Sequence, residues 1–123
     1  MADTYRLLRV RAVGDELIAL APVASLHGHT ESDAFRADLR TLESCPAQKV
    51  SLDVGEVTSI DGSFMGEIVK LWKSLHGRGV EFSVTASAPL AEIMAVTRLD
   101  KLFPVTAVPV ADSPLIVYAP ERN

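Results

Sequence analysis

The sequence predicts an α/β domain with a mixed, mostly parallel sheet that is flanked by helices and preceded by an N-terminal β-hairpin. The length of 123 residues fits one domain with one core. Two strand-like segments near the N-terminus are separated only by Gly14-Asp15, and strand and helix patterns alternate from Thr30 onward. A helix between two strands of one sheet implies a right-handed crossover between parallel strands.

The first two strands are expected on either side of the Gly14-Asp15 turn. Residues from Tyr5 to Val13 show a partial two-residue alternation of apolar and basic side chains. Residues from Glu16 to Ala24 form a nearly continuous apolar run. Such a run favours an internal strand that is covered on both faces.

The first helix is expected at about residues 32–44, with Thr30 or Ser32 as its cap. Apolar side chains recur there at spacings of four and three, and Pro46 follows the end of the pattern. Residues 49–54 then alternate as a short strand with three aliphatic side chains on one side.

A second helix is expected to begin within a residue or two of Asp61. Its apolar side chains, Phe64, Met65, Ile68, Val69, Leu71, Trp72 and Leu75, repeat with helical period. Most of this stripe is expected in the core. Gly79 suits the left-handed backbone that ends a helix, and the next strand alternates from Val80 to Thr85.

The last third of the chain predicts a third helix and one or two strands. Residues 87–89 open the helix, since proline is well tolerated in a first turn. Residues 103–110 form a strand or extended segment, and residues 115–118 an edge piece within the C-terminal segment 111–123. Inward side chains are expected at Leu90, Ile93, Met94 and Leu99.

Composition excludes several classes of function. The net charge is −4 and the basic residues form no patch, which argues against a nucleic-acid partner. The longest apolar-rich stretch, Leu17–Ala24, is too short to insert into a bilayer. With a single cysteine, Cys45, and no signal-like N-terminus, a cytoplasmic location is expected.

Three further patterns are better explained by a structural role than by a catalytic, metal-binding or nucleotide-binding role. His27 and His29 supply too few ligands for a metal site. Asp53 and Asp61 are a poor acid/base pair, because such pairs need tuned separation and unequal environments. Residues 77–79 follow a helix, which is the wrong place for a dinucleotide turn. No cofactor, metal or catalytic residue is expected.

The most informative segment leads from a strand through a polar turn into a helix that opens with Asp61, Gly62 and Ser63. The first N–H groups of a helix lack internal partners and carry partial positive charge, so a phosphoryl group on serine is tolerated there. Such a charge could block or create a partner contact while the helix stays folded. The alternative is that Asp61 or Ser63 only caps the helix.

An ordered set of residues is shared with a known family. It comprises Leu52-Asp53-Val54-x-x-Val57-x-x-Ile60-Asp61-Gly62-Ser63, an amphipathic helix, a Gly-x-x-Phe-x-Val strand and Leu99-Asp100-Lys101-Leu102-Phe103-Pro104-Val105. The set resembles the STAS family, the sulfate-transporter and anti-sigma-factor-antagonist domains. The resemblance covers about Asp15 to Val105 and is strongest over residues 50–105. It implies one non-enzymatic domain that binds a serine-kinase anti-sigma factor and releases a sigma factor when its loop serine is unphosphorylated.

One position departs from the family pattern. The resemblance places the phosphoacceptor hydroxyl directly after the aspartate, where this sequence has Gly62. Ser63 matches the second hydroxyl and is the remaining candidate phosphoacceptor. Either the acceptor role has moved to Ser63, or the protein binds without being switched. We favour the second, because a shift of one residue turns a side chain by about 100° around a helix.

The expected partner surface is this loop and the start of the following helix. Related alternatives are a stressosome-like scaffold and an accessory subunit of a membrane lipid transporter. A phosphoaspartate receiver with Asp53 as acceptor is a different class, but its magnesium site needs an acidic pair at the first strand, and Asp15-Glu16 falls in a hairpin turn. The expected partner-binding residues are Thr58, Ser59, Asp61, Gly62, Ser63 and Met65.

Overall fold

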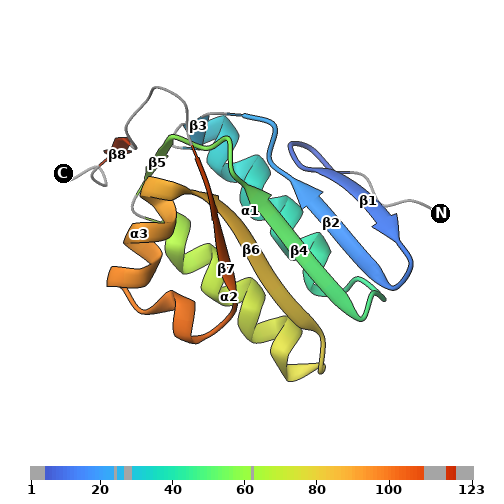
Figure 1. The fold of residues 1–123 in the computed structure, drawn as a ribbon. Coiled ribbons are helices and arrows are strands. Elements are labelled where there is room, and N and C mark those ends of the chain that lie inside the picture. The colour runs from blue at the N-terminus through green and yellow to red at the C-terminus, as the bar shows by residue number, and fades with distance from the viewer. Residues whose placement is uncertain (1–4, 24, 27–28, 62, 110–115, 119–123) are drawn as a thin grey trace.

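A five-stranded sheet and three α-helices make up most of the molecule (Figure 1). The computed structural model describes residues 5–23, 25–26, 29–61, 63–109 and 116–118. The elements are β1 (Arg9–Val13), β2 (Glu16–Leu20), β3 (Ser25–Leu26), α1 (His29–Glu43), β4 (Lys49–Val54), β5 (Ser59–Asp61), α2 (Phe64–Gly77), β6 (Glu81–Ser87), α3 (Ala88–Val96), the 3₁₀ turn η1 (Leu99–Lys101), β7 (Val105–Val108) and β8 (Ile116–Tyr118).

The main sheet has the strand order β1-β2-β4-β6-β7. β1 and β2 pair antiparallel, and the other neighbouring strands pair parallel. Gly14 makes the turn of the hairpin with φ +62°, a conformation that glycine adopts without steric cost. The expected mixed sheet with an N-terminal hairpin is confirmed.

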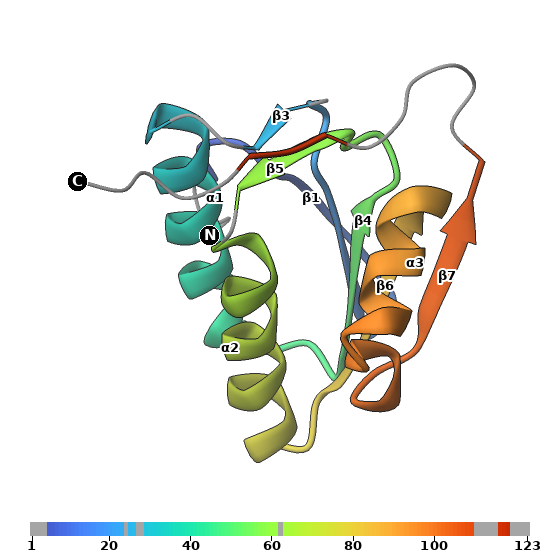
Figure 2. The same ribbon diagram turned by 90° about the vertical axis from the view of Figure 1, so that its left-hand side faces the viewer.

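All three α-helices lie on one face of this sheet (Figure 2). Each crossover steps to the next strand in the same direction, so right-handed connections place every helix on the same side. The alternating side chains of β4 and β6 that face the helices are buried: Val50, Leu52, Val54, Phe82, Val84 and Ala86. β2 is internal as expected, but its predicted cover on both faces is wrong, because no described helix lies on its second face.

A small second sheet lies at the carboxyl ends of β2 and β4. Its strand order is β3-β5-β8, and both pairs are parallel. β5 separates β4 from α2 and was not expected from the sequence. β8 is the edge piece predicted at 115–118; the rest of 111–123 lies outside the described residues.

Two helix starts differ from the expected ones. α1 begins at His29, so Thr30 and Ser32 lie within the helix and do not precede it as caps. α2 begins at Phe64, later than expected, because β5 extends to Asp61. His27 and Gly28 lie outside the described residues.

The end of α2 matches its prediction. Gly79 has φ +75°, and its N–H donates to the carbonyl of His76 at 3.0 Å. The N–H of Val80 donates to the carbonyl of Leu75 at 2.9 Å. These two bonds are the Schellman motif, so residues 77–79 form the helix stop that the sequence indicated.

A buried carboxylate ties the N-terminal segment to α1. Asp38 is 1% exposed and accepts backbone N–H bonds from Arg6, Leu7 and Leu8 at 2.8, 2.7 and 2.8 Å. A charged acceptor with three donors offsets the cost of its burial. The segment before β1 is therefore fixed by one side chain.

The remaining single-residue expectations are settled by burial. Leu90 and Met94 of α3 are buried, Leu99 is buried on η1, and Ile93 is only half-buried. Cys45, the single cysteine, is buried and makes no disulfide. Across the described part of the chain, no helix is long and apolar enough to span a bilayer.

Candidate functional site

The turn after β4 is closely packed. The N–H of Gly55 donates to Oδ1 of Asp53 at 2.9 Å, and the N–H of Val57 donates to the carbonyl of Val54 at 3.1 Å. A Cβ at position 55 would lie 2.8 Å from Cγ2 of Val108, which is closer than real Cβ contacts. Glycine at this position therefore lets the turn lie directly against β7.

The segment between this turn and α2 is held by the scaffold. Val57 is fully buried, and its carbonyl accepts a hydrogen bond from Oγ of Ser87 at 3.3 Å. Ile60 is 2% exposed, and β5 pairs on both sides with β3 and β8. The backbone that leads to α2 is thus positioned by burial and by strand pairing.

Ser63 occupies the N-cap position of α2. Its φ and ψ are −86° and −11°, its side chain makes no capping hydrogen bond, and its carbonyl accepts from the N–H of Glu67 at 3.0 Å. The interpretation that its hydroxyl caps the helix is wrong. Ser63 is exposed, so a partner can reach this end of the helix.

The first turn of α2 is oriented by one aromatic contact. Phe64 is 2% exposed, and its ring stacks on that of Phe35 from α1, with 5.4 Å between centroids and an interplanar angle of 9°. The next residues turn outward: Met65 is half-buried, and Gly66 is exposed with nothing within 4 Å of its Cβ position. We call Ser63, Met65 and Gly66 the α2 tip.

Charged side chains border the α2 tip. Oε2 of Glu67 lies 3.1 Å from Nε of Arg36 on α1 and 3.9 Å from Nζ of Lys70. Arg36 also lies 3.4 Å from Oδ1 of Asp33. The side chain of Glu67 is 12% exposed and that of Arg36 is 41% exposed, so this charged group bridges the two helices while its arginine stays accessible.

Comparison with known proteins identifies the fold. No protein-family model matches the sequence, and no curated protein does. A solved STAS domain protein of Planctomyces limnophilus matches 84% of this chain and 92% of its own, with 21% identity and a TM-score of 0.68. An anti-sigma factor antagonist of Mycobacterium paratuberculosis matches 82% of this chain and 85% of its own, with 16% identity and a TM-score of 0.72. The chain has a STAS-like fold.

A third match is the Bacillus cell fate determinant SpoIIAA in its phosphorylated form. It covers 81% of this chain and 91% of its own, with 12% identity and a TM-score of 0.58. The STAS-like fold therefore extends over most of the chain, as the ordered set of residues from β4 to β7 indicated.

The STAS-like fold brings together part of the expected partner surface. Ser63 is exposed, and Thr58 and Met65 are half-buried along the segment that leads into α2. Ser59 and Asp61 lie in β5, where the structure describes their backbone only, and Gly62 lies outside the described residues. Most of the expected set is thus in one continuous stretch.

Sequence reasoning missed two contributors to this surface. Gly66 was part of the helical pattern but was not marked, although a glycine within a helix costs about 1 kcal/mol relative to alanine and so signals a special position. Arg36 lies 31 residues before Glu67, and only the packing of α1 on α2 brings them together. No local sequence pattern predicts a contact between residues so far apart in the chain.

Asp53 and Asp15 lie apart in the main sheet: Asp53 pairs with Leu20 at the end of β4, and the carbonyl of Asp15 accepts from the N–H of Lys49 at the start of β4. Asp53 is half-buried at the end of β4, with Oδ1 engaged by Gly55, and Asp15 is exposed at the hairpin turn. Among the described residues, no three histidine, cysteine or acidic side chains are grouped to hold a metal ion.

Proposed function

We propose that this STAS-like domain acts by binding a protein partner, as an anti-sigma factor antagonist does, and not by turning over a substrate. The expected partner is a serine-kinase anti-sigma factor. The carrying observation is the α2 tip, where the exposed Ser63, the half-buried Met65 and the open Gly66 lie at the end of a rigidly held segment.

The α2 tip has the composition of a docking surface. Met65 offers an adaptable apolar side chain that is not fully used by the core. Gly66 leaves room for a partner backbone to approach the helix, which a larger side chain would prevent. The charges of Arg36 and Glu67 supply a polar rim beside this apolar centre.

We further propose that this chain is regulated differently from the phosphorylation switch that the STAS resemblance implies. One structural relative, SpoIIAA, is described in a phosphorylated form. Here Gly62 replaces the hydroxyl expected after Asp61, and Ser63 is displaced by one position. We therefore favour binding that is not switched by ordinary phosphorylation, because glycine has no hydroxyl to accept a phosphoryl group and Ser63, at the N-cap position of α2, lies one residue further along the chain.

The docking surface is tested by placing the same large side chain at the two ends of α2. Gly66→Arg and Gly77→Arg both add a side chain where nothing lies within 4 Å of the Cβ position. Binding to each serine-kinase anti-sigma factor of the same genome is measured by titration calorimetry. We expect Gly66→Arg to weaken binding by at least about 30-fold, roughly 2 kcal/mol, because it fills the proposed docking site.

Gly77→Arg is the matched control and is expected to bind within about twofold of wild type, since it lies at the opposite end of the helix. Thermal unfolding of both variants verifies the fold. Equal binding by the two variants would contradict the proposed surface, and so would the absence of binding to any of these kinases by the wild type.

Phosphorylation is tested by intact mass after incubation with the same kinases and ATP. We expect no added phosphate on the wild type. A phosphate that disappears in Ser63→Ala would show that the acceptor has moved to Ser63. One that persists in Ser63→Ala would contradict both interpretations of this loop and point to Thr58 or Ser59.

The alternatives predict other partners or another chemistry. A stressosome-like scaffold would assemble with further STAS proteins, and an accessory subunit would copurify with a lipid transporter. A receiver would accept phosphate on Asp53, but the doubly wound order 2-1-3-4-5 of receivers differs from the order found here, which starts with an antiparallel hairpin. The fold thus supports the receiver least.

A further inference from the structure

The face of the main sheet that points away from the helices has an ordered pattern of side chains. Residues paired across neighbouring strands share one face. One row across β1, β2 and β4 contains Arg9, Leu20 and Asp53, and the next contains Arg11, Ile18 and Ser51. We call these six residues the open face; no described helix covers them (Figure 1).

Two large aliphatic side chains lie at the centre of the open face. Ile18 and Leu20 are half-buried, but neither belongs to the core or to the partly buried residues that pack against it. Their neighbours Leu17 and Val10 do pack against the core. The continuous apolar run of β2 therefore includes two side chains that the chain's own helices leave uncovered.

Polar side chains continue the open face toward β6. Oγ of Ser51 donates to Oε2 of Glu16 and lies 3.2 Å from Oγ of Ser83. These bonds connect Glu16, Ser51 and Ser83 across three strands, beside the apolar centre of the face.

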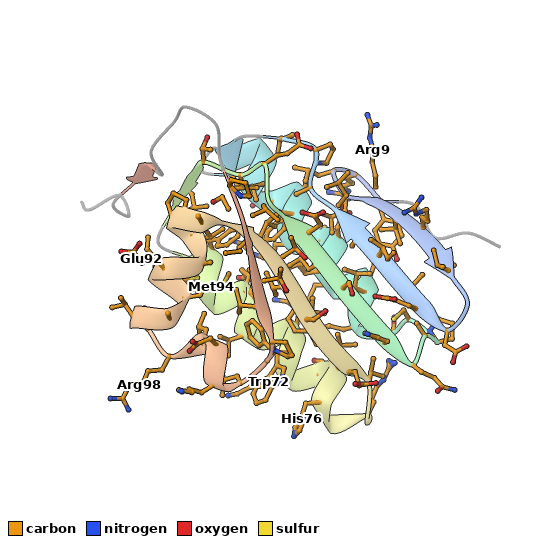
Figure 3. The ribbon with its side chains drawn as sticks, viewed as in Figure 1. Arg9, Trp72, His76, Glu92, Met94 and Arg98 are labelled. Atoms are coloured by element: carbon orange, nitrogen blue, oxygen red, sulfur yellow. The ribbon has the colours of Figure 1, made fainter. Side chains whose placement is uncertain are left out.

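The charges of the open face are complementary to each other across its centre. Arg9 and Arg11 are exposed on β1, and Arg9 extends away from the strand into solvent (Figure 3). On the other side of Leu20 lies Asp53. Within the part of the chain that the structure describes, neither arginine makes an ion pair.

We propose that the open face binds a second copy of this chain, with the two sheets packed face to face. A twofold axis that lies in the interface and runs along β2 would place β2 on β2 and β1 over β4 of the other copy. This rotation keeps each residue at the same height along the strand direction. Leu20 therefore meets Leu20 of the other copy, and Arg9 faces the other copy's Asp53. The pattern of basic, apolar and acidic residues in one row is thus self-complementary.

The predicted interface is small, because it spans a few short strands with two aliphatic side chains per copy. Specific interfaces of this extent lie at the weak end of the range, so we expect a dimer with a dissociation constant in the micromolar range or above. Charge pairs at its rim make dimerisation weaker as salt concentration rises. This proposal is independent of the proposed function, since the α2 tip lies on a helix and not on the open face.

The first test is sedimentation equilibrium of the full chain over a wide concentration range. We expect the average mass of the wild type to rise with protein concentration and to approach twice the mass of one chain at the highest concentrations. Leu20→Glu should weaken dimerisation at least about tenfold, because it places two carboxylates against each other at the centre. Val96→Glu is the matched control, since Val96 is 78% exposed on α3, and it should leave dimerisation unchanged.

The second test addresses the charge pairing. Arg9→Glu should weaken dimerisation several-fold, and Arg6→Glu, which changes an exposed arginine before the sheet, should not. A monomeric wild type at every concentration overturns the proposal, as does a dimer that tolerates both Leu20→Glu and Arg9→Glu. If the wild type is monomeric and Leu20→Glu loses the kinase partner, the open face belongs to that partner and the dimer is refuted.

Discussion

At the residue scale, Asp38 shows how a single charged side chain organises a segment far away in the sequence. Its two oxygens accept three backbone N–H bonds from residues 6–8, which precede the first strand. Hydrogen bonds to charged groups contribute about 1.5–3 kcal/mol each, and a buried donor that loses its acceptor costs a similar amount. The N-terminal segment therefore depends on this carboxylate.

Asp38→Asn tests that dependence. The amide group of asparagine would present N–H donors to backbone N–H donors, so we expect the free energy of unfolding to fall by about 2–4 kcal/mol in urea denaturation. Asp33→Asn is the control on the same helix, since its side chain is 67% exposed, and it should change stability by less than about 0.5 kcal/mol. Similar small effects of both variants would show that the three bonds contribute little.

At the scale of elements, two glycines near the candidate site differ in whether the packing around them requires a glycine. Gly55 lets the turn after β4 lie against β7, because a Cβ there would approach Val108 to 2.8 Å. Gly66 lies in α2 with open space around it, so the scaffold does not need a glycine at that position. The first glycine serves the fold, and the second is available to serve binding.

Alanine at each position separates these two roles. Gly55→Ala should lower stability by about 1–3 kcal/mol, because the turn or β7 must shift. Gly66→Ala should raise stability by about 0.5–1 kcal/mol, because alanine is the better helix former. The measurement is urea denaturation of both variants; destabilisation by Gly66→Ala, or none by Gly55→Ala, would contradict this assignment.

Elements with a clean repeating pattern could be predicted from the sequence. The alternation in β4 and β6 and the helical repeat in α2 gave their position and buried side, because one face of each element packs against one core. The start of α1 was missed because its first residues are polar and resemble a cap. β5 was missed because three residues are too few for a period.

At the scale of the whole molecule, the prediction for β2 shows the limit of a single sequence. Its apolar run correctly indicated an internal strand, but a pattern of hydrophobic residues does not tell which molecule covers them. The candidate site has the same limit: its continuous part, from Thr58 to Met65, stays a prediction from the sequence, whereas the Arg36–Glu67 pair depends on how α1 packs on α2.

The STAS-like fold thus presents two separate surfaces, the α2 tip at the end of a helix and the open face of the sheet. The proposed function concerns the first. A footprint of the bound partner on the whole chain tests it most directly, because it reports on every segment at once.

That measurement is amide hydrogen exchange of the chain with and without the serine-kinase anti-sigma factor that binds it. The account predicts slower exchange in the segment from Thr58 to Gly66 and unchanged exchange at the far end of α2, around residues 73–77. Protection at the far end of α2 or on the open face, with none at the α2 tip, would contradict it.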